Sequence, residues 1–240
     1  MQRKGRILFL RSTGVVFQKQ SAVLKFLTFR AVSESLKPEL FIYTITTYWI
    51  FSENGYSDIL ISESEKGGHK MSKSLIAFYS RADENYVRGT IKILDVGNTE
   101  IAANIIKKIT GADVFKIEQK TPYSKRYNDC TQEAEIDQQQ NARPELKCFP
   151  DSIEEYDIIY LGFPNYWSTM PMAVFTFLEH FDFSGKVIKP FCTHEGSGMG
   201  SSISDIKTLC PNAKVESGLA IYGSKIDSSI KDIGNWLQNK

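Results

Sequence analysis

Residues 156–167 read Tyr-Asp-Ile-Ile-Tyr-Leu-Gly-Phe-Pro-Asn-Tyr-Trp, and this stretch decides the fold. Its first seven residues are an almost continuous apolar run, which predicts a strand buried on both faces, as in a parallel sheet. A loop follows, and Pro171 then opens a helix as a first-turn proline. That helix is apolar almost all round, so we expect it to be buried. Strand, loop and helix together make one βα unit.

The same alternation repeats from Met71 to the end of the chain. Thr99 is a plausible N-cap for the first helix, and Gly111 ends it. The other strands are predicted at 74–80, 112–118, 186–193 and 214–222, and the other helices at 99–109, 128–141, before Cys210 and at 226–238. Five βα units joined by right-handed crossovers give an α/β fold, a three-layer doubly wound sheet of five parallel strands in the order 2-1-3-4-5.

In such sheets, ligands bind beyond the carboxyl ends of the strands where the strand order reverses, which here means the loops after the first, third and fourth strands. The first loop begins at Ser80-Arg81 and reaches Gly97-Asn98-Thr99 at the helix start, with the insertion Asp83–Val96 between them. Small residues and hydroxyls at a helix N-terminus let backbone N–H groups surround a phosphate. The alternative interpretation of Thr99 is an ordinary helix cap.

The second and third loops suit a flat ring. The second loop carries Pro164, Asn165, Tyr166 and Trp167, whose aromatic side chains present flat faces of the kind that lie against a planar ligand. Glycines in the third loop let the backbone approach such a ring, and its N–H groups can meet the ring edge. The residues of that loop are Thr193, His194, Glu195, Gly196, Ser197 and Gly198.

With these loops, the sequence resembles the flavodoxin family over about residues 73–224. The family's phosphate loop, Ser/Thr-x-Thr-Gly-x-Thr, is split here by the insertion, as in certain long-loop bacterial flavodoxin-like proteins. The run Phe191–Gly200 is similar to the same bacterial subgroup. The resemblance implies non-covalent FMN, electron transfer, and cofactor contacts by the residues named above in the three loops. Whether Tyr166 or Trp167 stacks on the flavin stays open.

Two functions follow from the resemblance. The first is an electron carrier whose partners are a reductase and a client protein. The second is an FMN-dependent NAD(P)H:quinone-type oxidoreductase, which passes electrons to a small acceptor. The insertion Asp83–Val96 could serve as a lid, a docking element or a dimer contact, and His194 could donate a proton rather than position the flavin.

Two other functions are rejected. A response-regulator receiver needs an aspartate at the end of its third strand, where this chain has Leu161-Gly162-Phe163. The stretch around Ser197 is not a nucleophile elbow, because Glu195 stands where that motif needs glycine.

Composition restricts the partners further. The net charge is +1, so a basic face for nucleic acid is not expected. The longest apolar run, Phe41–Phe51, is too short for the ~20 residues of a membrane-spanning helix and suits a strand. The four cysteines form no CxxC pair, so they read as reduced thiols of a cytoplasmic protein and not as a zinc site.

Residues 1–70 behave differently from the rest. They carry 10 Lys/Arg against 6 Asp/Glu and show short apolar bursts without a consistent period. Arg11 cuts the opening apolar stretch short, so a signal peptide is not expected. The codons of Lys66-Gly67-Gly68 can spell a bacterial ribosome-binding sequence just before Met71. We therefore predict either a poorly structured N-terminal extension or a misassigned start, with the native chain beginning at Met71.

Overall fold

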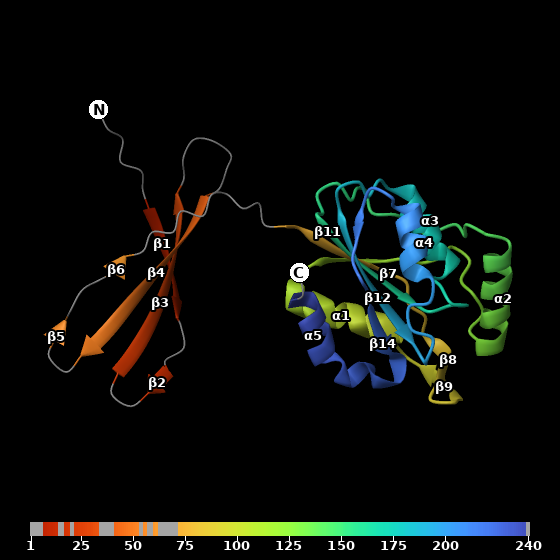
Figure 1. Cartoon of the computed structure of the whole chain (residues 1–240), viewed down its shortest axis with the longest axis horizontal. Coiled ribbons are helices and arrows are strands. Elements are labelled where there is room, and N and C mark those ends of the chain that lie inside the picture. The colour runs from red at the N-terminus through yellow and green to blue at the C-terminus, as the bar shows by residue number, and fades with distance from the viewer. Residues whose placement is uncertain are drawn as a thin grey trace. The chain divides into compact units, whose positions relative to one another are not determined.

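The structure is a computed structural model that describes the strands lying within residues 7–61 and the continuous chain 72–238. Side chains are described for residues 72–238 only. The chain divides into two compact units, Met1–Met71 and Ser72–Lys240 (Figure 1). Each unit is treated by itself below.

A parallel sheet forms the centre of the second unit. Its order is β10-β7-β11-β12, with β13 and β14 both pairing β12 at the far edge. The bounds are β7 Ser74–Phe78, β10 Asp113–Lys116, β11 Ile158–Pro164, β12 Val187–His194, β13 Lys214–Val215 and β14 Leu219–Tyr222. Every neighbouring pair is parallel. The predicted doubly wound sheet in the order 2-1-3-4-5 is confirmed.

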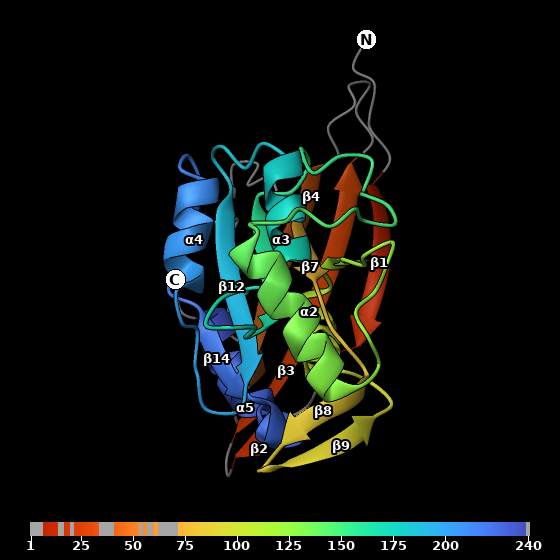
Figure 2. The ribbon, with the colours of Figure 1, turned by 90° about the vertical axis from the view of Figure 1, so that its right-hand side faces the viewer.

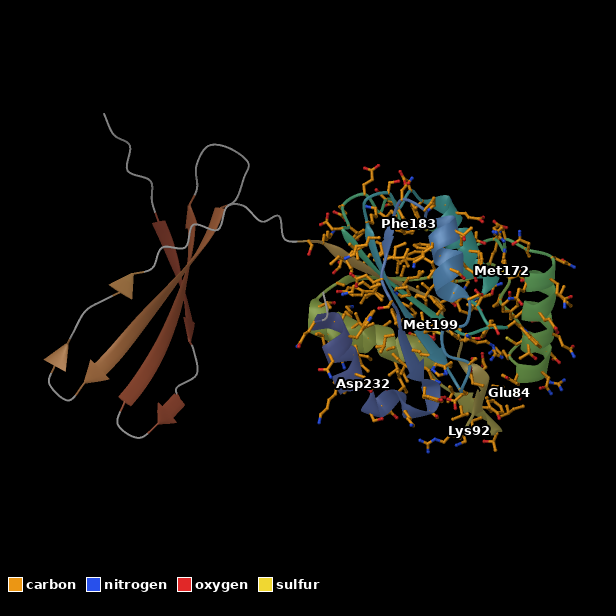
Figure 3. All side chains as sticks on the ribbon, in the orientation of Figure 1. Glu84, Lys92, Met172, Phe183, Met199 and Asp232 are labelled. Carbon is orange, nitrogen blue, oxygen red and sulfur yellow. The ribbon has the colours of Figure 1, made fainter. Side chains whose placement is uncertain are left out.

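Helices cover both faces of this sheet and bury two cores. On one face lie α1 (Asn98–Thr110) and α5 (Ile230–Gln238), and on the other lie α3 (Met172–His180) and α4 (Ser202–Leu209) (Figures 1 and 3). Phe177 of α3 is fully buried in the larger core. Trp236 of α5 packs edge-on against Tyr160 and Phe191 in the smaller core. The central strands are therefore apolar on both faces, as their sequences predict.

The predicted fifth strand, 214–222, is interrupted in the structure. Ile188 pairs with Val215, but Phe191 pairs with Leu219, so the edge strand contains one more residue than β12 between these pairs. Pro190 lies within this interval of β12 and has no N–H to donate to a neighbouring strand. The extra residue is a bulge beside the proline, which sequence periodicity did not reveal. The last predicted helix likewise divides into a 3₁₀ helix, η1 (Gly223–Ser228), and α5.

Two elements lie away from the two covered faces. The predicted insertion forms an antiparallel hairpin of β8 (Asp83–Val87) and β9 (Thr90–Leu94), which we call the β8–β9 hairpin. Its turn uses Arg88 and Gly89, both with positive φ, as two-residue hairpin turns require. The predicted helix at 128–141 is α2 (Tyr127–Gln139). Figure 2, turned by 90° from Figure 1, shows α2 in front of the sheet and the hairpin at the lower end of the second unit.

The first unit contains antiparallel strands. They are β1 (Ile7–Thr13), β2 (Phe17–Lys19), β3 (Ala22–Ser33), β4 (Phe41–Ser52), β5 (Gly55–Tyr56) and β6 (Leu60–Ile61). The poorly structured extension stays a prediction. β3 and β4 are equal in length and pair from Leu24↔Ile50 to Ser33↔Phe41, which satisfies their backbone groups mutually. The misassigned start stays a prediction.

Among the helices that the structure describes, none combines the length and the apolar character needed to cross a membrane.

Candidate functional site

A cavity of about 630 Å³ lies where the loops after β7, β11 and β12 meet. That volume is in the range of small-molecule and cofactor sites. Thirteen of the fifteen predicted site residues line it: Ser80, Arg81, Asn98, Thr99, Pro164, Asn165, Tyr166, Trp167, Thr193, His194, Glu195, Gly196 and Ser197. Gly97 and Gly198 are not among the lining residues. The three loops, far apart in the sequence, thus converge on one cavity.

One end of the cavity is the N-terminus of α1. Gly97 is the N-cap, and the N–H of Glu100 donates to Ser80 Oγ (3.1 Å) and to the carbonyl of Gly97 (3.0 Å). Within residues 72–238, the N–H groups of Asn98 and Thr99 have no hydrogen-bond acceptor. A Cβ on Gly97 would lie 2.3 Å from Ser80 Oγ, so the two ends of the split loop touch. Two unpaired N–H groups and a hydroxyl at a helix N-terminus suit a phosphate.

Thr99 is not the helix cap that the sequence predicted. Gly97 takes that position, and the Thr99 hydroxyl instead lies 2.7 Å from the hydroxyl of Thr193. Both threonines are buried, at 1% and 5% exposure. This hydrogen bond joins the first loop to the third, and only the tertiary fold could bring the two hydroxyls together.

Arg81 lines the cavity, but its guanidinium donates hydrogen bonds to backbone carbonyls of the protein. It donates to the carbonyls of Glu84, Ser124 (2.8 Å) and Lys125 (2.7 Å). These bonds fix the start of the β8–β9 hairpin and the segment that precedes α2. A cofactor contact by the Arg81 side chain stays a prediction.

Trp167 forms the aromatic wall of the cavity from a tight turn. Trp167 and Ser168 have φ values of 48° and 67°, and Tyr166 and Thr169 exchange two backbone hydrogen bonds across them (2.8 and 3.0 Å). The Trp167 side chain is on the rim at 47% exposure, and its Nε1–H donates to the carbonyl of Thr131 on α2 (2.8 Å). The turn therefore presents a flat indole beside the cavity.

Tyr166 also lines the cavity, but it lies deeper than Trp167. Its hydroxyl lies 3.8 Å from Cys130 Sγ, and its ring packs edge-on against Tyr79 (centroids 6.2 Å apart). Burial raises the pKa of Tyr166 well above its ordinary value and also raises the pKa of Cys130. Both groups are therefore neutral near pH 7, and Trp167 rather than Tyr166 offers an open ring face.

The third loop is held by its own side chains. Gly196 has φ 141° and donates its N–H to His194 Nδ1 (2.9 Å), while the His194 ring lies against Tyr222. Burial lowers the pKa of His194, although neighbouring Glu195 opposes the shift. A neutral histidine that accepts from the loop backbone has a positioning role here.

Glu195 connects the third loop to two other segments. Its carboxylate accepts from the N–H of Ser224 (2.6 Å) and from the N–H of Arg88 at the tip of the hairpin (3.3 Å). The Arg88 guanidinium in turn donates to the carbonyl of Ser224 (2.9 Å). Glu195 therefore anchors the β8–β9 hairpin over the cavity.

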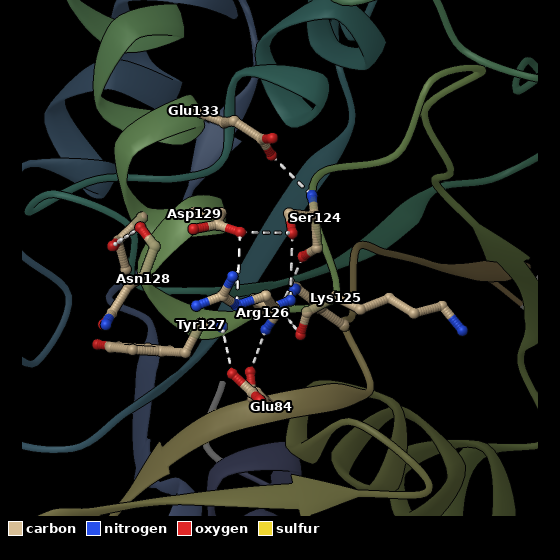
Figure 4. Close-up of polar contacts among 10 residues, drawn as sticks. Glu84, Ser124, Lys125, Arg126, Tyr127, Asn128, Asp129 and Glu133 are labelled. Carbon is tan, nitrogen blue, oxygen red and sulfur yellow. Dashed lines mark hydrogen bonds and ion pairs between the residues drawn. The ribbon is translucent and has the colours of Figure 1, made fainter.

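The remaining wall consists of residues that sequence reasoning missed. Tyr86 of the hairpin stacks on Tyr127 of α2, with ring centroids 6.2 Å apart, and both line the cavity. Figure 4 shows how Glu84 of the hairpin accepts from the Tyr127 N–H (2.8 Å). The other lining residues of this wall are Asn85, Cys130, Thr131 and Ala134. The alternating apolar residues of 90–94 could have revealed the hairpin, but nothing in the sequence places α2 here.

No cluster of metal-ligating side chains occurs among residues 72–238. The residues present do fit FMN, because the cavity joins unpaired N–H groups at one end to an open indole face and a glycine-rich loop at the other.

A doubly wound sheet with this site at its strand ends defines a flavodoxin-like α/β protein. The family model described as Flavodoxin matches residues 93–240, which is more than half of the chain. The chain therefore belongs to the flavodoxin family, and this membership supports FMN as its cofactor.

Solved structures agree with this assignment. A candidate flavoprotein from Bacteroides eggerthii is 25% identical, with a TM-score of 0.52, over 68% of this chain and 98% of that one. A second, from Bacteroides uniformis, is 24% identical, with a TM-score of 0.56, over 70% of this chain and 99% of that one, and shows the same fold. Among the curated proteins, none matches this sequence.

Proposed function

We propose that this protein is an FMN-dependent electron-transfer protein whose cofactor occupies the cavity at the carboxyl ends of β7, β11 and β12. The observation that carries the proposal is the convergence of three loops of different chemistry on one cavity. One supplies phosphate-binding donors, one an aromatic face and one a glycine-rich backbone. Each is what a different part of FMN needs.

The phosphate would be held by neutral donors. These are the N–H groups of Asn98 and Thr99 at the positive end of α1, together with the Ser80 hydroxyl, which accepts from Glu100 and can donate its own hydrogen. The ring would lie at Trp167 and the loop 196–198. Flat apolar contact and backbone donors there hold the ring without a covalent bond.

When bound, FMN supplies reversible uptake and release of electrons. Two side chains of the cavity wall are kept neutral and partly dry. Tyr166 and Cys130 stay protonated because burial raises the pKa of each. Neutral His194 holds the third loop in place through the N–H of Gly196. Because the bound cofactor would be partly shielded from water, fixed protein groups would set its electron affinity.

A second candidate is an FMN-dependent NAD(P)H:quinone-type oxidoreductase. The Tyr86–Tyr127 pair favours it, because these rings line the cavity on a wall apart from the predicted FMN contacts. A pair of aromatic rings on that wall gives a flat surface for a second planar molecule, either a nicotinamide or a quinone. The carrier would instead exchange electrons with a reductase and a client protein. For both candidates we expect a cytoplasmic protein.

The deciding experiment is a visible absorption spectrum of the purified protein, before and after addition of FMN. We expect flavin bands that stay with the protein through gel filtration. Their absence after FMN is added would overturn the proposal. Steady oxidation of NAD(P)H by the FMN-loaded protein with a soluble quinone, and no partner protein, would favour the oxidoreductase. Electron exchange only with a flavodoxin reductase would favour the carrier.

A further inference from the structure

We propose that Asp205, on α4 and outside the cavity, is a positioning residue that fixes the Trp167–Ser168 turn and thereby the indole face offered to FMN. The proposal deepens the proposed function and rests on it for its effect on the flavin. Its effect on the turn itself is independent of any cofactor.

The turn is in a conformation that its residues do not favour. Both central positions have positive φ, which two-residue hairpin turns normally fill with Asn and Gly. For residues with a Cβ, the left-handed region is sterically unfavourable, because the Cβ comes too close to the following carbonyl oxygen. Trp167 and Ser168 keep this conformation only if their surroundings hold them, and such strain is concentrated at functional sites.

Asp205 holds the turn through two hydroxyl groups. Its Oδ2 accepts from Thr169 Oγ1 (2.5 Å), on the residue that closes the turn. The same oxygen accepts from Ser201 Oγ (2.8 Å). Ser201 in turn donates its N–H to the carbonyl of Ser168 (2.7 Å), while its single hydroxyl hydrogen is shared between Asp205 and that carbonyl (3.2 Å). One carboxylate oxygen thus joins the end of the turn to the segment lying over it.

The contact between α4 and the turn is also tight. A Cβ on Gly200 would lie 1.9 Å from the Ser168 carbonyl oxygen, so only glycine fits where the third loop enters α4. On its other side, Asn165 accepts from the Ser168 N–H (3.1 Å) and donates to the carbonyl of Gly198 (2.9 Å). Asn165 therefore holds the turn on one side and the start of α4 holds it on the other. Asp205 supplies the charged group among these contacts.

A different role for Asp205 must be separated from this one. An acidic residue in the first turn of a helix also stabilises the helix dipole. Asp232 occupies the same kind of position on α5, in the helix layer on the other face of the sheet (Figure 3). Asp232→Asn is therefore the matched control, because it removes a first-turn charge without touching Trp167.

The test compares Asp205→Ala, Asp205→Asn and Asp232→Asn in the full chain. Hydrogen exchange of the 166–169 amides is measured without FMN, and FMN affinity and the visible circular dichroism of bound flavin are measured with it. For Asp205→Ala we expect at least fivefold faster exchange, about tenfold weaker FMN binding, as for the loss of one charge-assisted hydrogen bond, and an altered flavin spectrum. Asp205→Asn should show nearly wild-type exchange, FMN affinity and flavin spectrum, since its amide oxygen can accept from both hydroxyls.

Unchanged exchange in a folded Asp205→Ala protein would overturn the proposal, as would an equal effect of Asp232→Asn. If Asp205→Ala does not fold, Ser201→Ala, which removes an exposed hydroxyl, must give the same changes in smaller measure. A wild-type protein that binds no FMN would overturn the proposed function, but the exchange measurement would still decide the role of Asp205.

Discussion

We expect the flavin contact to depend on Trp167. Because its indole face is open and Tyr166 lies deeper, Trp167→Ala should weaken FMN binding about tenfold, the loss expected for one aromatic contact. Trp167→Phe keeps a flat ring but loses the hydrogen bond to Thr131, so it should retain most of the affinity. Titration of flavin fluorescence measures both. Equal loss in the two variants would assign the effect to the hydrogen bond instead.

A separate prediction concerns Gly97, at the end of the cavity where we expect the phosphate. Its φ of −69° is open to any residue, but an alanine Cβ would lie 2.3 Å from Ser80 Oγ and 2.4 Å from the Arg81 carbonyl oxygen. Gly97→Ala should therefore weaken FMN binding by about tenfold or more. The matched control is Gly234→Ala on α5, where nothing lies within 4 Å. It should leave binding unchanged and stabilise the fold by about 0.5–1 kcal/mol, measured by urea unfolding.

At the scale of elements, the β8–β9 hairpin and α2 form one lining of the cavity because Arg81 and Glu84 join them. Arg81→Met keeps the side-chain length and removes the donors. We expect faster hydrogen exchange over the hairpin and the start of α2, and less than tenfold loss of FMN affinity, because the guanidinium is committed to carbonyls. Arg143→Met, which breaks an ion pair with Glu179, is the control.

The same variant tests the sequence-based assignment of Arg81 to the cofactor. A direct charge on the phosphate would give a loss of affinity that shrinks at high salt, since salt screens that attraction. If the loss of FMN affinity depends on salt and hydrogen exchange of the hairpin is unchanged, Arg81 contacts the phosphate. That result would contradict its anchoring role.

At the scale of the whole molecule, buried thiols make stability depend on alkaline pH. Burial raises the pKa of Cys192 and of Cys210 to about 12, from 9.0. In the unfolded chain these thiols ionise above pH 9, while in the folded protein they stay neutral. The contribution of these neutral thiols to the free energy of unfolding is therefore fully present below pH 9 and is lost as the pH rises toward 12. Between pH 8 and pH 9.5 these two thiols should lower the free energy of unfolding by about 1.5 kcal/mol, and Cys130, whose pKa burial also raises, adds to the fall.

Urea unfolding at the two pH values checks this expectation. Cys192→Ala should remove about 0.8 kcal/mol of this fall, whatever the substitution costs in stability, because one of the shifted thiols is gone. Cys148→Ser, at an exposed position, should keep the full dependence. If the free energy of unfolding of Cys192→Ala falls with pH as steeply as that of the wild type, Cys192 does not cause the pH dependence.

Much of the fold was readable from the sequence because parallel strands buried on both faces form apolar runs. The strands 156–162 and 186–193 differ from β11 and β12 by one or two residues at each end. The interruption of the last strand was not readable, because the effect of Pro190 on a neighbouring strand exists only once the two strands are paired. The hairpin was treated as an insertion, since its exposed strands lack a buried face.

The sequence by itself determined the strand order and the three loops at the strand ends, because local periodicity and chain connectivity are sufficient for both. It could not decide which aromatic residue faces the cavity, what Thr99 and Arg81 bind, or that α2 and Asp205 take part. Each of these depends on contacts between residues tens of positions apart, such as Thr99 with Thr193 and Thr169 with Asp205. Such contacts have no local signature, because they come into being only when the sheet brings its loops to one edge.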